Sequence, residues 1–191
     1  MSLILASQSP RRRELLGLFR IPFQVRVADV DEKMDPNLDP AQEVARVSRL
    51  KAEAIPREAG DVVVAADTIV VCQGQVLGKP RDEKDAQRML ELLSGGFHQV
   101  MTGLTVLCGE QAVTCTEVTD IYFRPLETRE ILDYIRTGEP MDKAGSYGIQ
   151  GGAALFAEKL VGDYYNVMGL PVCRLGMLLG QIAPQLMEER V

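Results

Sequence analysis

The chain is poor in the residues that build the commonest metal and nucleophile sites. It has a single histidine, His98, and it has neither an HExxH motif nor a cluster of cysteines. These absences argue against a zinc centre and against a serine–histidine catalytic triad. The four cysteines form no CxxC pair, so we expect reduced thiols buried in the core of a cytosolic protein.

Long apolar runs and an excess of positive charge are also missing. The first apolar run, 3–6, is shorter than a signal peptide needs, and its positive charge follows rather than precedes it. The most apolar later stretch, 167–183, is interrupted by Pro171 and Arg174, so we expect no membrane span and a cytoplasmic location. There are 21 basic and 27 acidic residues, a net charge of −6, which argues against binding to nucleic acid or to an anionic membrane.

What is present suits one domain of ordinary size. The 191 residues are 46% hydrophobic and 25% charged, as is usual for a soluble globular chain. Expected helices and strands alternate at first, and a long antiparallel pair follows, which predicts an α/β protein with a mixed, partly antiparallel sheet flanked by helices. The expected strands are 3–6, 23–28, 61–72, 97–107, 112–123 and 154–161, and the expected helices begin near residues 10, 40, 83, 127 and 171.

The first stretch, LILASQSPRRRELL at 3–16, places too much positive charge at the start of a helix. Ser9 is in position to cap the helix, and a proline follows as its first residue. Arg11, Arg12 and Arg13 then fill the first turn, where each cation is unfavourable by about 0.3–1 kcal/mol. Two interpretations stay open. Either an anion is held by backbone N–H groups, serine hydroxyls and an arginine, or the turn is simply solvated.

Carboxylates and a lysine occupy further unusual positions. The acidic loop 29–35, which includes Glu32, is either solvated or part of a Mg²⁺ site. Lys51 falls on the apolar face of the helix that starts at Pro40, where it either extends to the boundary of the core or reaches an anion. Asp67 interrupts an apolar strand, so it must be paired, bound to an ion, or at an exposed strand end.

Two glycine-containing segments complete the set. GKP at 78–80 offers Lys79 beside a backbone that a ligand can approach, although an exposed turn has the same composition. MDKAGSYGIQGG at 141–152 can pack its backbone against a ligand or make tight turns, and it matches neither the P-loop nor the Rossmann pattern. If these polar residues converge on one cleft, they suit metal-assisted attack on a phosphoryl centre.

Six motifs together resemble the Maf family of house-cleaning nucleoside triphosphate pyrophosphatases, in order and over essentially the whole chain. They are LILASQSPRRRELL at 3–16, VDE at 30–32, LKAEA at 50–54, AADT at 65–68, GKP at 78–80 and DKAGSYGIQG at 142–151. The resemblance implies a single domain over 1–191 with an inosine-triphosphatase-like fold and a cleft between two lobes. It also implies a homodimer, a divalent metal cation (Mg²⁺ or Mn²⁺), and hydrolysis of a nucleoside triphosphate to the monophosphate and pyrophosphate.

The same resemblance assigns roles to individual residues. Asp67 matches the proton acceptor for the water that attacks the α-phosphorus, and Glu32 matches a carboxylate that holds the metal or orients that water. Both are candidate metal ligands. The residues that match the phosphate-binding set are Ser7, Arg12, Lys51 and Lys79. The resemblance leaves Asp31 and Lys143 without a role.

One branch of the family acts on dTTP and UTP, and its specificity positions fall on Arg12, Thr68 and Gln150. A glutamine amide offers both a donor and an acceptor to the N3–H and O4 edge of thymine or uracil. The resemblance therefore implies a dTTP/UTP pyrophosphatase, with modified pyrimidine triphosphates as further candidate substrates. The alternative is a nucleotide-binding regulator of cell division or septum formation, with slow incidental hydrolysis.

Overall fold

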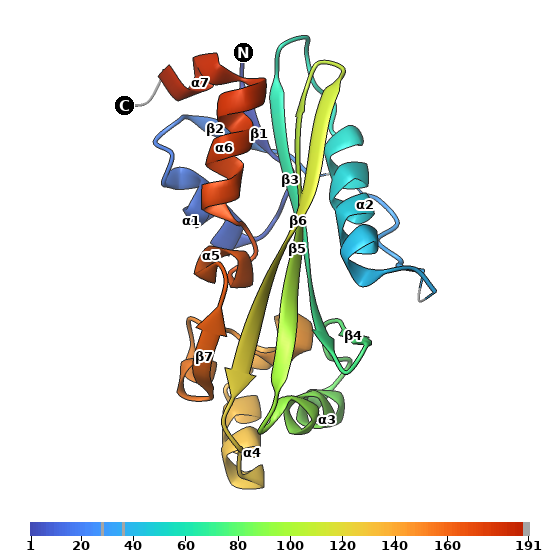
Figure 1. Cartoon of the computed structure of the whole chain (residues 1–191), viewed down its shortest axis with the longest axis vertical. Coiled ribbons are helices and arrows are strands. Elements are labelled where there is room, and N and C mark those ends of the chain that lie inside the picture. Colours follow the sequence, from blue (N-terminus) through green and yellow to red (C-terminus); the bar gives the residue numbers. More distant parts are fainter. Residues whose placement is uncertain (28, 36, 189–191) are drawn as a thin grey trace. The chain divides into compact units, whose positions relative to one another are not determined.

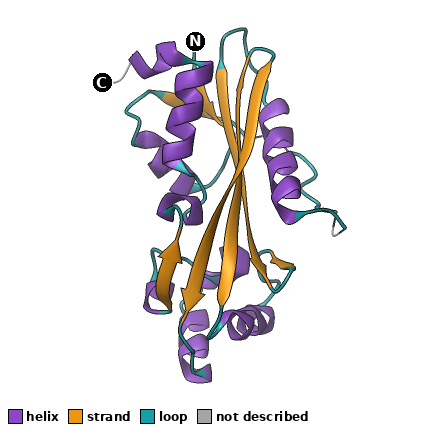
Figure 2. Ribbon diagram, in the orientation of Figure 1, coloured by secondary structure: helices purple, strands orange, loops and turns teal. Residues whose placement is uncertain are grey.

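The computed structural model describes residues 1–27, 29–35 and 37–188, and a mixed sheet organises them (Figures 1 and 2). Seven strands lie in the order β2-β1-β3-β5-β6-β7, with β4 paired to β3 off this path. The strands are β1 (Leu3–Leu5), β2 (Phe23–Val25), β3 (Val62–Cys72), β4 (Gln75–Leu77), β5 (Phe97–Cys108), β6 (Gln111–Phe123) and β7 (Ala157–Val161). The α-helices are α1 (Pro10–Gly17), α2 (Pro40–Glu53), α3 (Glu83–Leu93), α4 (Thr128–Arg136), α5 (Tyr164–Val167), α6 (Val172–Ile182) and α7 (Pro184–Glu188).

The chain forms two compact units. The first contains Met1–Asp67, Thr102–Glu117 and the described residues from Gly169 on, and the second contains Thr68–Met101 and Val118–Met168. Strands β3, β5 and β6 therefore each contribute one part to each unit. In β3 the boundary falls directly after Asp67.

In the first unit, β1 is the central strand. It pairs in parallel with β2 on one side and with β3 on the other, so that Leu3 lies opposite both Phe23 and Val62. Figure 1 shows α2 on one side of the strands and α1 and α6 on the other. Ile4 of β1 is fully buried in a cluster with Ile55, which follows α2. Apolar residues on both faces of β1 thus account for its burial between helices.

Helix α2 lies unusually close to β5. A Cβ atom added to Gly103 of β5 would lie 2.2 Å from the carbonyl oxygen of Val44, so only glycine fits here. Buried hydroxyl groups join the same two elements: Ser48 Oγ lies 2.8 Å from Thr105 Oγ1, which lies 2.9 Å from Thr114 Oγ1 of β6. These contacts fix the position of α2 on the strands.

The second unit is built around a core of aromatic rings. The β3–β4 hairpin begins it, and its turn, Gln73-Gly74, has positive φ at both residues as a tight two-residue turn requires. His98 is buried, lies edge-to-face against Phe123, and approaches Tyr147 Oη to 2.8 Å with its Nε2 atom. Burial lowers the pKa of His98 to about 4, so the imidazole is neutral at pH 7.

Local sequence signals predicted most of these elements. The expected capping residue of the first helix is confirmed, because Ser9 accepts a backbone N–H in the first turn of α1. Asp39 and Asp82 cap α2 and α3 in the same way. The short helices α5 and α7 were not expected. Among the described residues, no helix is long and apolar enough to cross a membrane.

Two expected strands are too long, and the expected thiol positions are partly wrong. The strand expected over 154–161 starts only at Ala157, because residues 152–155 form a 3₁₀ turn. The strand expected over 23–28 ends at Val25, where its partner β1 also ends, and residue 28 lies outside the described residues. Only one of the four cysteines is a core thiol: Cys72 is buried, Cys108 and Cys115 are half-buried, and Cys173 is exposed.

Candidate active site

One ammonium group joins two carboxylates in the first unit. Lys51 Nζ donates a hydrogen bond of 2.7 Å to Asp67 Oδ1 and lies 2.9 Å from Glu32 Oε1. The side chains of Lys51 and Asp67 are each 13% exposed, whereas that of Glu32 is 59% exposed. The carboxylate in the apolar strand is therefore paired, and the inward-facing lysine reaches it. Such pairing is needed because an uncompensated charge at this depth is strongly destabilising.

Arg12 is held in place at the start of α1. Its Nε donates 2.8 Å to the carbonyl oxygen of Gly169, and its Nη1 donates 3.3 Å to Ser7 Oγ. Ser7 is buried, and its hydroxyl oxygen also accepts the backbone N–H of Ser9 at 3.2 Å. The basic first turn is thus not simply solvated: Arg12 is half-buried and tied to the segment that precedes α6.

The electrostatic surroundings of Arg12 link it to the two carboxylates. Burial lowers the pKa of Arg12, and the positive charge of Arg11 lowers it further. The negative charges of Asp67 and Glu32 oppose both effects and raise this pKa. The first unit therefore gathers two cations, Arg12 and Lys51, around two carboxylates, which is a charge pattern suited to a phosphorylated ligand with its counter-cation.

The two carboxylates also have the chemistry of a hard-cation site. Magnesium sites in phosphoryl-transfer enzymes usually take one or two protein carboxylates and complete their shell with phosphate oxygens and water. Glu32 and Asp67 fit this pattern, because both lie within hydrogen-bonding distance of the same positive charge on Lys51. In the part of the chain that the structure describes, no group of three or more His, Cys, Asp or Glu side chains gathers at a potential metal position.

The remaining predicted site residues belong to the second unit. Thr68 directly follows Asp67 in β3 and is half-buried, while Lys79 and Gln150 are exposed. The backbone ties the two exposed segments together, because Gly145 N donates 3.1 Å to the carbonyl oxygen of Gly78. The predicted residues thus form two groups, one in each unit, with the boundary at Asp67 and Thr68.

The glycine-rich segment encloses a carboxylate that sequence analysis missed. Glu139 accepts hydrogen bonds from Tyr134 Oη at 2.9 Å and from Gly152 N at 3.0 Å. A Cβ atom at Gly151 would lie 2.0 Å from Glu139 Oε1, so this glycine is needed for the close approach. Lys143, which had no expected role, donates 2.7 Å to the carbonyl oxygen of Glu139. These contacts hold the segment that carries Gln150.

The fold and this arrangement of charges define a mixed α/β protein with a candidate site for a phosphorylated ligand, and comparison with known proteins gives its family. The chain belongs to the Maf family: the family profile, described as Maf-like protein, matches residues 2–182. Two relatives named dTTP/UTP pyrophosphatase come from Alkaliphilus metalliredigens and Bacillus pumilus. The first is 49% identical over 183 residues, covering 93% of this chain and 94% of the relative. The second is 50% identical over 173 residues, covering 90% and 92%.

A solved structure supports the fold independently of sequence identity. The HAM1 protein from Coxiella burnetii superimposes with a TM-score of 0.51 at 12% identity, covering 95% of this chain and 99% of that one. At this identity the likeness concerns the fold alone. The predicted fold class, a mixed α/β sheet flanked by helices of the inosine-triphosphatase type, is confirmed.

Proposed function

We propose that this chain is a nucleoside triphosphate pyrophosphatase that hydrolyses dTTP and UTP to the monophosphate and pyrophosphate, removing unwanted nucleotides from the pool. Modified pyrimidine triphosphates are further candidate substrates. The observation that carries the proposal is the ammonium group of Lys51 between the carboxylates of Asp67 and Glu32, in a member of the Maf family. The printed names of relatives at about 50% identity support the choice of substrate.

We assign to Asp67 the role of accepting a proton from the attacking water. Lys51 holds one carboxylate oxygen, Oδ1, at 2.7 Å, which fixes the orientation of the group in β3. The carboxylate can accept further hydrogen bonds, so a water placed against it can lose its proton as it attacks the α-phosphorus. General-base assistance of this kind contributes about 10²–10⁴-fold to a rate.

The cationic side chains are assigned to the phosphates. Ser7 and Arg12 at the start of α1 and Lys51 on α2 would neutralise charge on the reacting phosphoryl group and on the leaving pyrophosphate. Lys79 in the second unit belongs to the same set in this proposal. Mg²⁺ or Mn²⁺, held by Glu32 and Asp67, would supply Lewis-acid polarisation of the phosphoryl oxygens and additional positive charge.

Base selection is assigned to Arg12, Thr68 and Gln150. The amide of Gln150 offers a donor and an acceptor, which matches O4 and N3–H of thymine and uracil. Cytosine reverses this pattern at the same two atoms. Because the amide can rotate by 180° and exchange its donor and acceptor, Gln150 rejects CTP only where its neighbours hold it in the orientation that suits thymine and uracil.

The test is pyrophosphate release from a panel of dTTP, UTP, CTP, dATP and dGTP in the presence of Mg²⁺ or Mn²⁺. We expect dTTP and UTP to be cleaved at least tenfold faster than the others, and Asp67→Asn to abolish more than 99% of turnover. Equal cleavage of dATP, dTTP and UTP would contradict the assigned specificity. Wild-type turnover in Asp67→Asn would show that another group takes the proton.

The same assay separates the enzyme from a nucleotide-binding regulator of cell division. Tight binding of dTTP with turnover slower than about one per hour would favour a regulator over an enzyme of ordinary speed. We also propose a cytoplasmic homodimer that does not bind nucleic acid. Light scattering at micromolar concentration tests the dimer, and salt-dependent binding to a DNA duplex would contradict the last point.

A further inference from the structure

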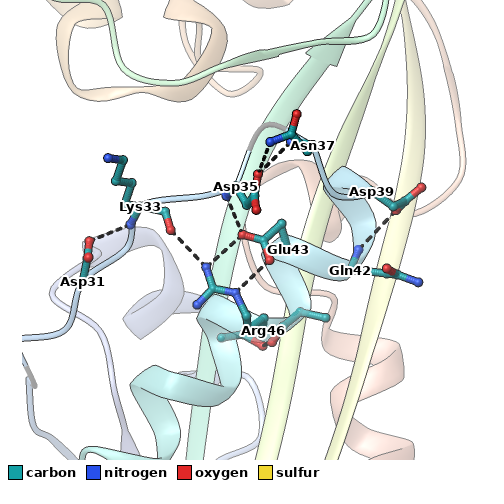
Figure 3. A network of polar contacts seen from close by, with 10 residues as sticks. Asp31, Lys33, Asp35, Asn37, Asp39, Gln42, Glu43 and Arg46 are labelled. Carbon is teal, nitrogen blue, oxygen red and sulfur yellow. Dashed lines mark hydrogen bonds and ion pairs between the residues drawn. The ribbon is translucent and has the colours of Figure 1, made fainter.

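The loop that carries Glu32 is anchored to helix α2 by a buried carboxylate (Figure 3). Glu43, in the first turn of α2, is 2% exposed, and its Oε2 accepts the backbone N–H of Asp35 at 2.8 Å. Arg46 donates to both oxygens of Glu43, each at 2.8 Å, and to the carbonyl oxygen of Lys33 at 3.0 Å. Two backbone groups of the loop are therefore held by one pair of side chains.

The same helix carries the partner of Glu32. Lys51 is two turns along α2 from Glu43, and its Nζ lies 2.9 Å from Glu32 Oε1. Helix α2 thus sets the position of both members of this ion pair, holding Lys51 directly and Glu32 through the anchored loop. Because the Glu32 side chain is 59% exposed, packing contributes little to its orientation, and the path of the adjacent backbone matters more.

We propose that Glu43 and Arg46 are positioning residues that hold Glu32 beside Lys51 and Asp67 for the reaction. This inference rests on the proposed function. The guanidinium group suits the task because its planar fork donates to both oxygens of one carboxylate and still reaches a carbonyl oxygen. The side chains of Glu43 and Arg46 themselves need not touch the nucleotide.

The experiment is a double-mutant cycle between the anchor and the residue it positions. Glu43→Gln keeps the shape of the side chain and removes its charge, and we expect kcat for dTTP to fall about tenfold, since a displacement of about 1 Å can cost 10²-fold in rate. Glu32→Gln removes the positioned group. If Glu43 acts through Glu32, the double variant is no more than twofold slower than Glu32→Gln alone.

A second readout does not depend on turnover. In the metal-free protein, Glu43 Oε2 accepts the amide N–H of Asp35. Because Glu43→Gln retains an oxygen that can accept this bond, the exchange test uses Glu43→Leu, which removes the acceptor and should speed hydrogen exchange at Asp35 about tenfold or more. Arg46→Lys keeps the positive charge on a side chain that is 43% exposed and removes the fork, and it provides the same test if either Glu43 variant folds poorly. In Arg46→Lys, kcat for dTTP should fall and hydrogen exchange at Asp35 should become faster.

Glu130 in the second unit supplies a matched control. It also accepts two bonds from one arginine, Arg124, and one backbone N–H, that of Glu127 at 3.0 Å. The hydrogen bonds from arginine and backbone lower the pKa of both Glu43 and Glu130 to about 2. Glu130→Gln should leave the exchange of Asp35 unchanged. Any effect it has on kcat should multiply with that of Glu32→Gln.

The outcomes separate the two proposals. If the wild type is active, either of two results would overturn the positioning role. The first is that the effects of Glu43→Gln and Glu32→Gln on kcat multiply, and the second is that the exchange rate at Asp35 does not change. A wild type that releases no pyrophosphate from dTTP or UTP would overturn the proposed function instead. In that case an unaltered Asp35 exchange rate in Glu43→Leu would still contradict the anchor.

Discussion

Replacing Gly103 with alanine should move a helix that carries catalytic charge. The added Cβ would lie 2.2 Å from the Val44 carbonyl oxygen and 2.8 Å from Ala45 Cα, and both atoms belong to the backbone of α2. No side-chain rotation can relieve such a contact, so α2 must withdraw from β5 by about 1 Å or more to reach an ordinary van der Waals distance. The buried 2.8 Å hydrogen bond between Ser48 and Thr105 then lengthens as well.

The expected cost is large relative to the stability of a domain. Overpacking a core costs about 1–3 kcal/mol, and weakening the buried hydroxyl pair adds about 1 kcal/mol. We therefore expect Gly103→Ala to lower the free energy of unfolding by about 3 kcal/mol, out of a total of about 5–15 kcal/mol. With a urea m-value of about 3 kcal/mol/M, the unfolding midpoint falls by about 1 M.

The folded fraction of Gly103→Ala should also lose activity, because α2 carries Lys51. The assay is made without urea, on protein whose circular dichroism shows the native helix content. Under this condition we expect kcat for dTTP to fall about tenfold or more. Gly180→Ala in α6 is the matched control, because nothing lies within 4 Å of its added Cβ. That variant should gain about 0.5–1 kcal/mol, as expected for alanine in a helix. A Gly103→Ala protein within 1 kcal/mol of the wild type and fully active would refute the reasoning.

Three further predictions concern other parts of the chain. Arg12→Ala should lower kcat about 10²-fold or more, while losing the bond to the Gly169 carbonyl should cost only about 1–2 kcal/mol of stability, measured by urea unfolding. Because the pKa of His98 falls from 6.5 to about 4 on folding, the imidazole of the unfolded chain binds a proton at a higher pH than that of the folded chain. Stability should hold above pH 6.5 and decrease by about 3 kcal/mol toward pH 4, and His98→Gln should lack this slope. Gly151→Ala, whose Cβ meets Glu139 Oε1 at 2.0 Å, should lower kcat/KM for dTTP about tenfold by displacing the loop.

The sequence predicted what short-range physics decides. Ser9, Asp39 and Asp82 precede helices with free N–H groups in their first turn, so a cap is readable from a few neighbouring residues. The turn at Gln73-Gly74 is readable in the same way, since both residues tolerate positive φ better than branched residues do. Helical periodicity also placed Lys51 on the inward face of α2.

The same local patterns could not predict contacts between residues far apart in the sequence. Periodicity turned Lys51 inward, but its partner Asp67 is 16 residues away on a strand, and only the fold brings the two together. In the sequence, Glu43 resembles any acidic residue in the first turn of a helix, and its burial depends on a loop that folds back over it. The roles of the individual site residues remain predictions drawn from family motifs.

The boundary between the two compact units separates neighbours in the chain. Asp67, to which we assign the proton, ends one unit within β3, and Thr68, to which we assign part of the choice of base, begins the other. Their Cα atoms are joined by one peptide bond and lie about 3.8 Å apart in any conformation that keeps the bond trans. Whatever motion accompanies substrate entry or product release, Thr68 and Asp67 stay joined by one peptide bond. Because the two residues are consecutive in one strand, we expect a substrate that displaces Thr68 to disturb Asp67 as well, so that discrimination between bases appears in kcat as well as in KM.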